Sequence, residues 1–173
     1  RHRQYLLVKA PPACGKSRAM MFVALDKLEN QGIKKVIVAV PEKTIGRSFD
    51  NTNLKDFGFF ADWRVADYFN LCGGNETEKK KRFFEFIDKG CKNKILVCTH
   101  STLRNAVKEL SDEQLNDCLF GIDEYHHSSA DANNGLGELI RRLIANTNAH
   151  ILAMTGSYFR GDKIPVMRPE DEA

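Results

Sequence analysis

The sequence predicts an α/β protein in which a mainly parallel central sheet carries helices on both faces. Apolar, strand-like runs alternate along the chain with helical patterns, which is typical of parallel βαβ units. Two of the runs, Val36–Val40 and Ile95–Cys98, are apolar at successive positions, as expected for strands buried between two helix layers. The length of 173 residues suits one domain with a full-sized core. We therefore expect a single three-layer domain over residues 1–173.

Six apolar runs account for the expected strands. Their residues favour a pleated surface that is at least half buried. In chain order, the predicted strands are Tyr5–Ala10, Lys35–Val40, Trp63–Tyr68, Lys94–Thr99, Leu119–Asp123 and His150–Thr155. The segments Asn51–Phe60 and Asn70–Asn75 have the composition of loops.

Helical patterns lie between these runs. The predicted helices are Lys16–Asn30, Glu76–Lys89, Ser101–Glu109 and Gly135–Asn146. Gly32 follows the first of them and suits the left-handed turn that ends a helix. Ser111 and Asp112 can cap a further short helical turn. The basic run Lys79–Arg82 lies within the second helix, where it indicates a solvated face or, alternatively, a contact with phosphates.

Composition narrows the class of protein. The 26 basic and 23 acidic residues give a net charge of +3, which is too small to diagnose or exclude a nucleic-acid partner. Five scattered cysteines without a C-x-x-C pair favour a reducing, cytoplasmic setting over a disulfide framework or a zinc site. No apolar stretch approaches the roughly 20 residues that span a bilayer. Because the chain has no initial Met and a strand begins almost at once, we expect a piece of a longer protein without membrane association.

The segment Ala10–Ser17 predicts a phosphate-binding loop. Its sequence, Ala-Pro-Pro-Ala-Cys-Gly-Lys-Ser, fits G-x-x-x-x-G-K-[ST] with alanine for the first glycine. It joins a strand to a helix, so backbone N–H groups and the helix dipole favour an anion there. We expect Lys16 to reach the β- and γ-phosphates of ATP and Ser17 to help hold Mg²⁺, although a surface turn is the alternative. The other nucleotide-binding positions expected in this loop are Pro12, Ala13, Cys14, Gly15 and Arg18.

A second segment supplies the acidic residues that the hydrolysis of ATP needs. Leu119–Glu124 is an apolar run that ends in two carboxylates. Hydrolysis of ATP needs one acid for the Mg²⁺ shell and one group that activates water, and Asp123 and Glu124 fit these roles in that order. A helix-capping acidic pair is the alternative when this run is taken alone. In a parallel sheet, however, both segments end at the same edge, where ligands bind.

Several motifs together resemble superfamily 2 helicases and translocases. Asp123-Glu-Tyr-His126 resembles their DExH box, and Ala10–Ser17 then resembles their motif I, where alanine is common in first position. Val38–Thr44 resembles motif Ia. Leu96–Leu103 resembles the motif in which a strand end and a threonine touch the nucleic-acid backbone.

A last motif narrows the resemblance to one subfamily. Ala153–Asp162 resembles motif III in the form found in type III restriction-subunit-like helicases. Ser157 and Tyr158 stand where threonine and proline are usual. The resemblance covers nearly the whole chain, with the motifs in the expected order.

The resemblance implies a P-loop NTPase with the RecA-like fold, the first of two such lobes. It implies an ATP hydrolase that couples hydrolysis with Mg²⁺ to movement on nucleic acid or to unwinding, with DNA favoured over RNA. Asp123 would ligate Mg²⁺ through water, and Glu124 would be the catalytic base. His126 would couple this site to Thr155 and Ser157 in motif III.

The same resemblance implies a nucleic-acid face on this lobe. Pro41, Thr99, His100 and Ser101 would lie on it and contact the backbone without reading sequence. Ordinary capping of the following helix is an equal explanation for Thr99 and Ser101.

The resemblance implies a second lobe that would supply arginines across the ATP cleft, and the 12 residues after Gly161 do not form such a lobe. The isolated chain is therefore expected to turn ATP over very slowly. Two alternatives stay open: another P-loop motor, such as a DNA-packaging-type ATPase, and a non-catalytic nucleotide-dependent binding module. The intact Glu124 weighs against the second, because a pure switch needs no water-activating carboxylate.

Overall fold

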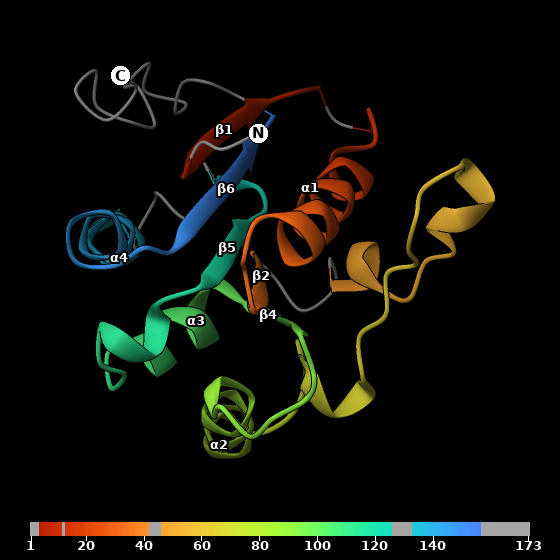
Figure 1. Ribbon diagram of the computed structural model, residues 1–173. Coiled ribbons are helices and arrows are strands. Elements are labelled where there is room, and N and C mark those ends of the chain that lie inside the picture. Colours follow the sequence, from red (N-terminus) through yellow and green to blue (C-terminus); the bar gives the residue numbers. More distant parts are fainter. Residues whose placement is uncertain (1–3, 12, 42–45, 126–132, 157–173) are drawn as a thin grey trace.

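A parallel sheet forms the centre of the domain (Figure 1). The computed structural model describes residues 4–11, 13–41, 46–125 and 133–156. Within them, six strands lie in the order β1-β6-β5-β2-β4-β3, and every pairing is parallel. The strands are β1 (Tyr5–Lys9), β2 (Lys35–Val40), β3 (Asn70–Leu71), β4 (Ile95–Thr99), β5 (Cys118–Ile122) and β6 (His150–Thr155).

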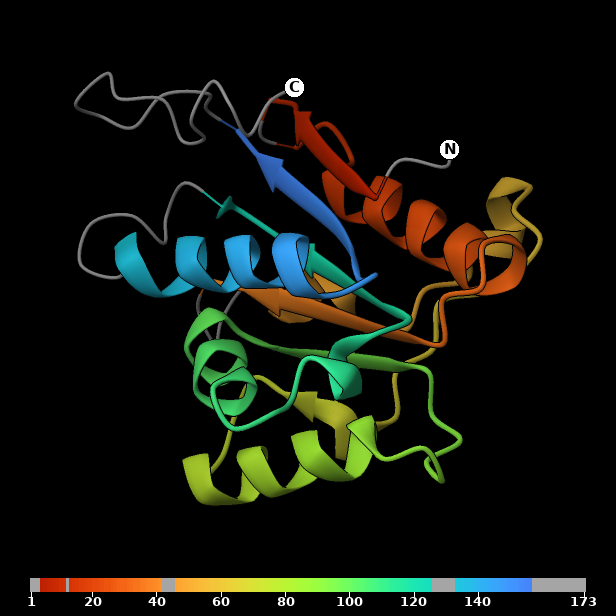
Figure 2. The ribbon, with the colours of Figure 1, turned by 60° about the vertical axis from the view of Figure 1, so that its left-hand side comes forward.

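Helices cover both faces of this sheet, as the sequence predicts (Figure 2). The blue and green helices α4, α3 and α2 pack on one face, and the orange helix α1 packs on the other. Their bounds are α1 (Lys16–Asn30), α2 (Glu76–Ile87), α3 (His100–Val107) and α4 (Asn133–Asn146). The predicted three-layer α/β architecture is therefore confirmed.

Strand β2 shows how one run of apolar residues serves two cores. Its alternate side chains point to opposite faces of the sheet. Ile37 and Ala39 belong to the core beneath α2, α3 and α4, whereas Val36 and Val38 belong to the core beneath α1. All four are 0% exposed, which explains why the sequence reads as a continuous apolar run rather than as an alternation.

The segment between β2 and β3 completes the layer that contains α1. Trp63 is fully buried there, and its indole Nε1–H donates to the Phe49 carbonyl at 2.9 Å. A strand at Trp63–Tyr68 was expected, and this prediction is wrong: Trp63 makes only an isolated antiparallel bridge with Thr52. The aromatic side chain that suggested a strand fills the core instead, since strand propensity largely reflects fit to a buried surface.

The strand that belongs at this edge is the short β3, Asn70–Leu71, within a segment expected to be a loop. The predicted loop Asn51–Phe60 contains a turn of 3-10 helix at Leu54–Phe57. The other predicted strands and helices are present, with ends that shift by one or two residues. Helix α1 has the expected bounds, and Gly32 after it has a φ of 73°. None of the described helices is long and apolar enough to cross a membrane.

A glycine sets the distance between α1 and the strand that carries the acidic pair. A Cβ atom added to Gly121 in β5 would lie 2.6 Å from Sδ of Met20 in α1. Met20 is itself fully buried, so it has little room to move. Helix α1 can therefore approach β5 closely only because position 121 has no side chain.

We expect Gly121→Ala to lower the free energy of unfolding by about 1–3 kcal/mol, because the added methyl group overpacks this contact. Gly137→Ala is the matched control, since a Cβ there makes only an ordinary contact of 3.6 Å within α4. The control should stabilise the chain by about 0.5–1 kcal/mol through helix propensity. Urea denaturation measures both, and equal effects of the two substitutions would contradict close packing at Gly121.

At the opposite end of the sheet, a buried lysine lies against a histidine. Lys27 of α1, 3% exposed, lies with Nζ 2.8 Å from Nδ1 of His150 at the start of β6. Burial, and then the charge of Lys27, lower the pKa of His150. Below the ordinary histidine pKa of about 6.5 the unfolded chain takes up a proton that the folded chain does not, so stability falls as the pH falls.

His150→Gln should remove this contribution. The loss of unfolding free energy between pH 7.5 and 5.5 should then be smaller in the variant than in the wild type. Urea titrations at the two pH values test this, and an equal loss in both proteins would show that His150 does not contribute.

Candidate nucleotide-binding site

The phosphate-loop lysine and the second acidic residue meet at the carboxyl edge of the sheet. Lys16 Nζ lies 2.6 Å from Glu124 Oε1, although the two residues are 108 positions apart. Lys16 begins α1 directly after the loop that follows β1, and Glu124 lies two residues past β5. Their side chains are 8% and 21% exposed, so the ion pair is largely shielded from water. The structure thus brings together the two segments that the sequence assigns to one site.

The backbone of the loop leaves the start of α1 free for an anion. Gly15, the N-cap, has a φ of 86° and offers no side-chain cap, and no acidic residue lies in the first turn. Ala13 also has a left-handed φ of 59°, which non-glycine residues seldom adopt. Cys14 is exposed and Ser17 is half-buried, while Pro12 lies outside the described residues. Uncapped N–H groups at a helix start are a suitable binding site for phosphate.

The two carboxylates have different environments. Asp123 is 4% exposed, and burial, followed by the neighbouring charge of Glu124, raises the pKa of its carboxyl group. The nearby ammonium of Lys16 opposes this rise. Glu124 is more accessible and takes a left-handed φ of 48°. The site therefore holds one buried acid and one that pairs with the loop lysine.

The end of β6 closes the site from a third side. A Cβ atom on Gly156 would lie 3.3 Å from Lys16 Nζ and 3.9 Å from Glu124 Oε2. Thr155, directly before it, is fully buried, and its carbonyl accepts the N–H of Ala10 at 3.1 Å. Sequence reasoning placed Thr155 here but did not single out Gly156. The Thr-Gly pair within the motif III segment was the available signal.

Two further residues expected to couple this site to motif III, His126 and Ser157, lie outside the described residues. Arg18, expected to touch nucleotide, is exposed, and its guanidinium lies 4.5 Å from the centre of the Phe57 ring. The structure thus pairs Arg18 with the segment between β2 and β3. A direct phosphate contact by Arg18 stays a prediction.

The residues expected on a nucleic-acid face gather at the start of α3. Thr99 caps this helix: its Oγ1 accepts the N–H of Thr102 at 3.3 Å and lies 3.1 Å from Ser101 Oγ. Capping was one of two explanations for Thr99, and it is confirmed. Ser101 is exposed, and Pro41, at the end of the neighbouring β2, is half-buried.

His100 is placed differently from the expectation. His100 is 5% exposed, and its Nε2 lies 2.9 Å from the carbonyl oxygen of Asp123. The first residue of α3 therefore points toward the acidic segment and not toward the surface. Sequence alone did not reveal this, because a histidine between two hydroxyl residues fits a surface contact as well as an inward one.

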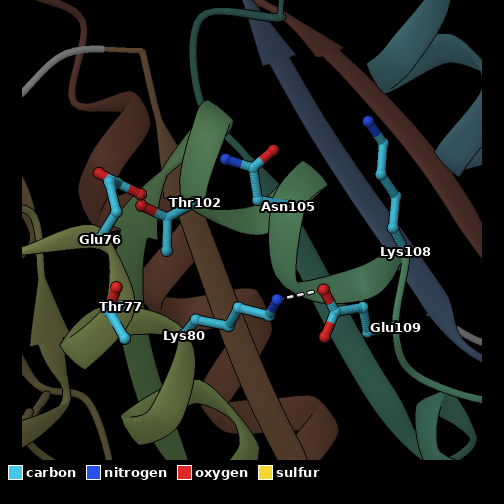
Figure 3. A pocket seen from close by; sticks show the side chains of 7 residues that line it. All are labelled: Glu76, Thr77, Lys80, Thr102, Asn105, Lys108 and Glu109. Carbon is cyan, nitrogen blue, oxygen red and sulfur yellow. Dashed lines mark hydrogen bonds and ion pairs between the residues drawn. The ribbon is translucent and has the colours of Figure 1, made fainter.

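A groove between α2 and α3 adjoins this helix start (Figure 3). Its volume is about 390 Å³, and it is lined by Glu76, Thr77, Lys80, Thr102, Asn105, Lys108 and Glu109. Lys80 and Glu109 form an ion pair across it. The groove shares no lining residue with the Lys16–Glu124 pair, and Thr102 connects it to Thr99 through a contact of 3.0 Å between hydroxyl oxygens.

The donor set at the site suits magnesium. Ser17 and Asp123 offer oxygen ligands, which Mg²⁺ prefers. Among the residues that the structure describes, no group of three or more His, Cys, Asp or Glu could hold a metal ion. Mg²⁺ bound at this edge would therefore take further ligands from water and from phosphates, as it does at phosphate-transfer sites.

Comparison with known proteins gives a consistent result. The family model described as "Type III restriction enzyme, res subunit" matches residues 1–160. A protein of Bacillus subtilis (strain 168) named "Putative ATP-dependent helicase YeeB" is 58% identical over 172 residues. The match covers 99% of this chain and 28% of that protein, so the chain spans just over a quarter of its relative.

Two solved structures share the fold. The helicase domain of Hef from Pyrococcus furiosus has a TM-score of 0.60 at 20% identity, with 98% of this chain and 32% of that chain covered. The UvsW helicase from bacteriophage T4 has a TM-score of 0.58 at 20% identity, with 95% and 50% covered. The predicted RecA-like fold, and the resemblance drawn from the motifs, are thereby confirmed.

The ion pair predicts that removing either partner lowers stability. Glu124→Gln leaves the shielded ammonium of Lys16 opposite a neutral amide and should lower the free energy of unfolding by about 1–3 kcal/mol. Lys16→Met should also lower it, because it removes the ammonium that offsets the repulsion between the adjacent carboxylates Asp123 and Glu124. Urea unfolding of the isolated chain measures both effects.

Lys34→Met is the matched control, since Lys34 pairs with Asp117 at 2.9 Å but is 75% exposed. Its effect should stay within about 1 kcal/mol. If Glu124→Gln cost no more than this control, the Lys16–Glu124 pair would not be the shielded contact described above.

Proposed function

This chain belongs to the family of type III restriction enzyme res subunits, and we propose on that premise that it is the ATP-binding lobe of a nucleic-acid-dependent ATPase. The parent protein would couple ATP hydrolysis to movement on nucleic acid or to its unwinding. The relative named as an ATP-dependent helicase supports this proposal. The observation that carries it is the 2.6 Å contact between Lys16 and Glu124.

The proposed chemistry follows from what this contact does when nucleotide enters. The phosphates bind at the uncapped start of α1, where the N–H groups after Gly15 face an anion. Lys16 then turns from Glu124 to the β- and γ-phosphates. Glu124, released from its partner, becomes free to orient a water molecule and accept its proton.

The buried Asp123 and the hydroxyl of Ser17 would hold Mg²⁺, Asp123 through water. When bound, this ion neutralises charge that develops on the phosphates. Ser17 lies one residue into α1 and Asp123 directly follows β5, so both belong to the same sheet edge. Lys16, Asp123 and Glu124 are the proposed catalytic residues.

Full activity would need the rest of the parent protein. We propose that residues 1–173 form one lobe of two and that a second lobe supplies arginine across the ATP cleft. An arginine added across an interface can raise turnover by about 10³–10⁵-fold. The isolated chain should therefore bind nucleotide weakly and hydrolyse it very slowly.

The proposed track is a nucleic-acid backbone, with DNA favoured over RNA, along the start of α3. Ser101 is exposed there, and the hydroxyl of Thr99 is within 3.1 Å of it. Pro41 lies on the same edge, because Val40 pairs with Thr99. His126, Thr155 and Ser157 would couple this face to the ATP site, and the five free cysteines support a cytoplasmic setting.

Steady-state ATP turnover of the full-length parent protein tests this function. It should be measured without polymer, with DNA and with RNA, and Lys16→Ala provides the blank. We expect one polymer to stimulate turnover and the substitution to abolish it.

Turnover that ignores both polymers would favour another kind of P-loop motor, such as a DNA-packaging-type ATPase. Nucleotide binding without any turnover would favour a non-catalytic binding module. The contact between Glu124 and Lys16 weighs against the second alternative, since a module that only binds needs no carboxylate at that place.

A further inference from the structure

We propose that His100 is a positioning residue that connects the nucleic-acid face to Glu124, so that strand binding at Ser101 sets the direction of the catalytic carboxylate. This inference rests on the proposed function and deepens it, because it names how the track regulates the ATP site. His100 was expected on the surface. The structure instead buries His100, which is 5% exposed, and places its side chain against the acidic segment.

The topology makes this contact possible. Strand β2 lies between β4 and β5, with Thr99 in register with Val40 and Ile122 in register with Ala39. His100 and Asp123 therefore leave the sheet at almost the same height, on either side of β2. The histidine ring crosses the end of β2 and reaches the carbonyl oxygen of Asp123 at 2.9 Å.

Asp123 is held at both ends of its backbone. Its N–H donates to the Ala39 carbonyl at 2.9 Å, and its carbonyl oxygen faces Nε2 of His100. Because a carbonyl can only accept, Nε2 carries the proton in this contact. The donor is therefore a neutral or a charged imidazole, and the proposal does not depend on which.

The carbonyl that His100 contacts belongs to the peptide bond that leads into Glu124. This bond is planar, so fixing its oxygen fixes the orientation of the Glu124 N–H and the direction in which the chain continues. Glu124 itself has a φ of 48°, which a glutamate keeps only where its surroundings hold it. His100 is one of the groups that hold it.

The two neighbours of His100 in the chain, Thr99 and Ser101, belong to the proposed nucleic-acid face. Thr99 precedes His100 and caps α3, and its Oγ1 contacts the hydroxyl oxygens of Ser101 and Thr102 at 3.1 and 3.0 Å. A phosphate oxygen that accepts the Ser101 hydroxyl proton would compete with Thr99 for that hydroxyl. This exchange changes the hydrogen bonds of the first turn of α3, and His100 is the first residue of that turn.

The test compares two substitutions of His100, with side chains of different length, in the full-length protein. A glutamine amide nitrogen can take the place of Nε2 and donate to the Asp123 carbonyl, whereas an asparagine amide is one methylene shorter. His100→Gln should keep the stimulation of ATP turnover by nucleic acid. His100→Asn should reduce the stimulated kcat by about 10- to 100-fold, since small misplacements of catalytic groups have effects of this size.

Three accompanying measurements separate positioning from a general structural defect. The KM for ATP and the affinity for nucleic acid should each change by less than about threefold in both variants, since neither removes a group that touches a ligand. Turnover without polymer should fall by a smaller factor than stimulated turnover in His100→Asn. Ser101→Ala tests the track side, because it removes the hydroxyl for which a phosphate oxygen and Thr99 would compete. It should weaken nucleic-acid binding and also reduce the stimulated kcat at saturating polymer. An unchanged stimulated kcat would show that the Ser101 hydroxyl does not convey strand binding.

The remaining outcomes overturn the proposal. If both variants keep or both lose the stimulation, the hydrogen bond to Asp123 is not the link. If stimulated and unstimulated turnover fall by the same factor, His100 only supports Glu124 and conveys nothing from the track. A wild-type protein that no nucleic acid stimulates would instead contradict the proposed function itself, and with it this inference.

Discussion

The contact between Lys16 and Glu124 is the interaction on which the rest of the site depends. It requires β1 and β5 to end at the same edge of the sheet, which parallel pairing ensures. It also requires β6 between them, and this order brings Gly156 against the pair, where a side chain would crowd the ammonium. A close approach of α1 to β5 at Gly121 completes the arrangement. Gly121, Gly156 and the strand order therefore determine where the ammonium of Lys16 meets the carboxylate of Glu124.

The edge of the sheet that carries this contact has several features that lower the stability of the fold locally. Asp123 is buried beside another carboxylate, and Ala13 and Glu124 have left-handed backbones. Each feature is unfavourable on its own. The two cores on the faces of the sheet offset these costs, since Phe120 and Leu119, neighbours in β5, anchor the acidic segment in both of them. A well-packed interior thus supports a strained edge.

Much of this arrangement was predictable from sequence, and the exceptions have physical reasons. The loop before α1 and the acidic end of β5 each carry local patterns that chemistry demands, so both were found. Trp63 was misleading, because an aromatic residue fits a buried surface whether or not its backbone pairs. His100 was misplaced because the direction of a side chain at a helix start depends on what lies across the neighbouring strand. Gly156 was overlooked because its role is the absence of a side chain, which only the position of Lys16 reveals.

The most direct test of one nucleotide site formed by both segments is a crystal structure of the chain with Mg²⁺ and a non-hydrolysable ATP analogue. The account predicts that Lys16 leaves Glu124 and contacts the β- and γ-phosphates. It also predicts that Ser17 and Asp123 face the metal and that Glu124 faces the γ-phosphate. An intact Lys16–Glu124 pair beside a fully occupied nucleotide bound elsewhere would contradict it.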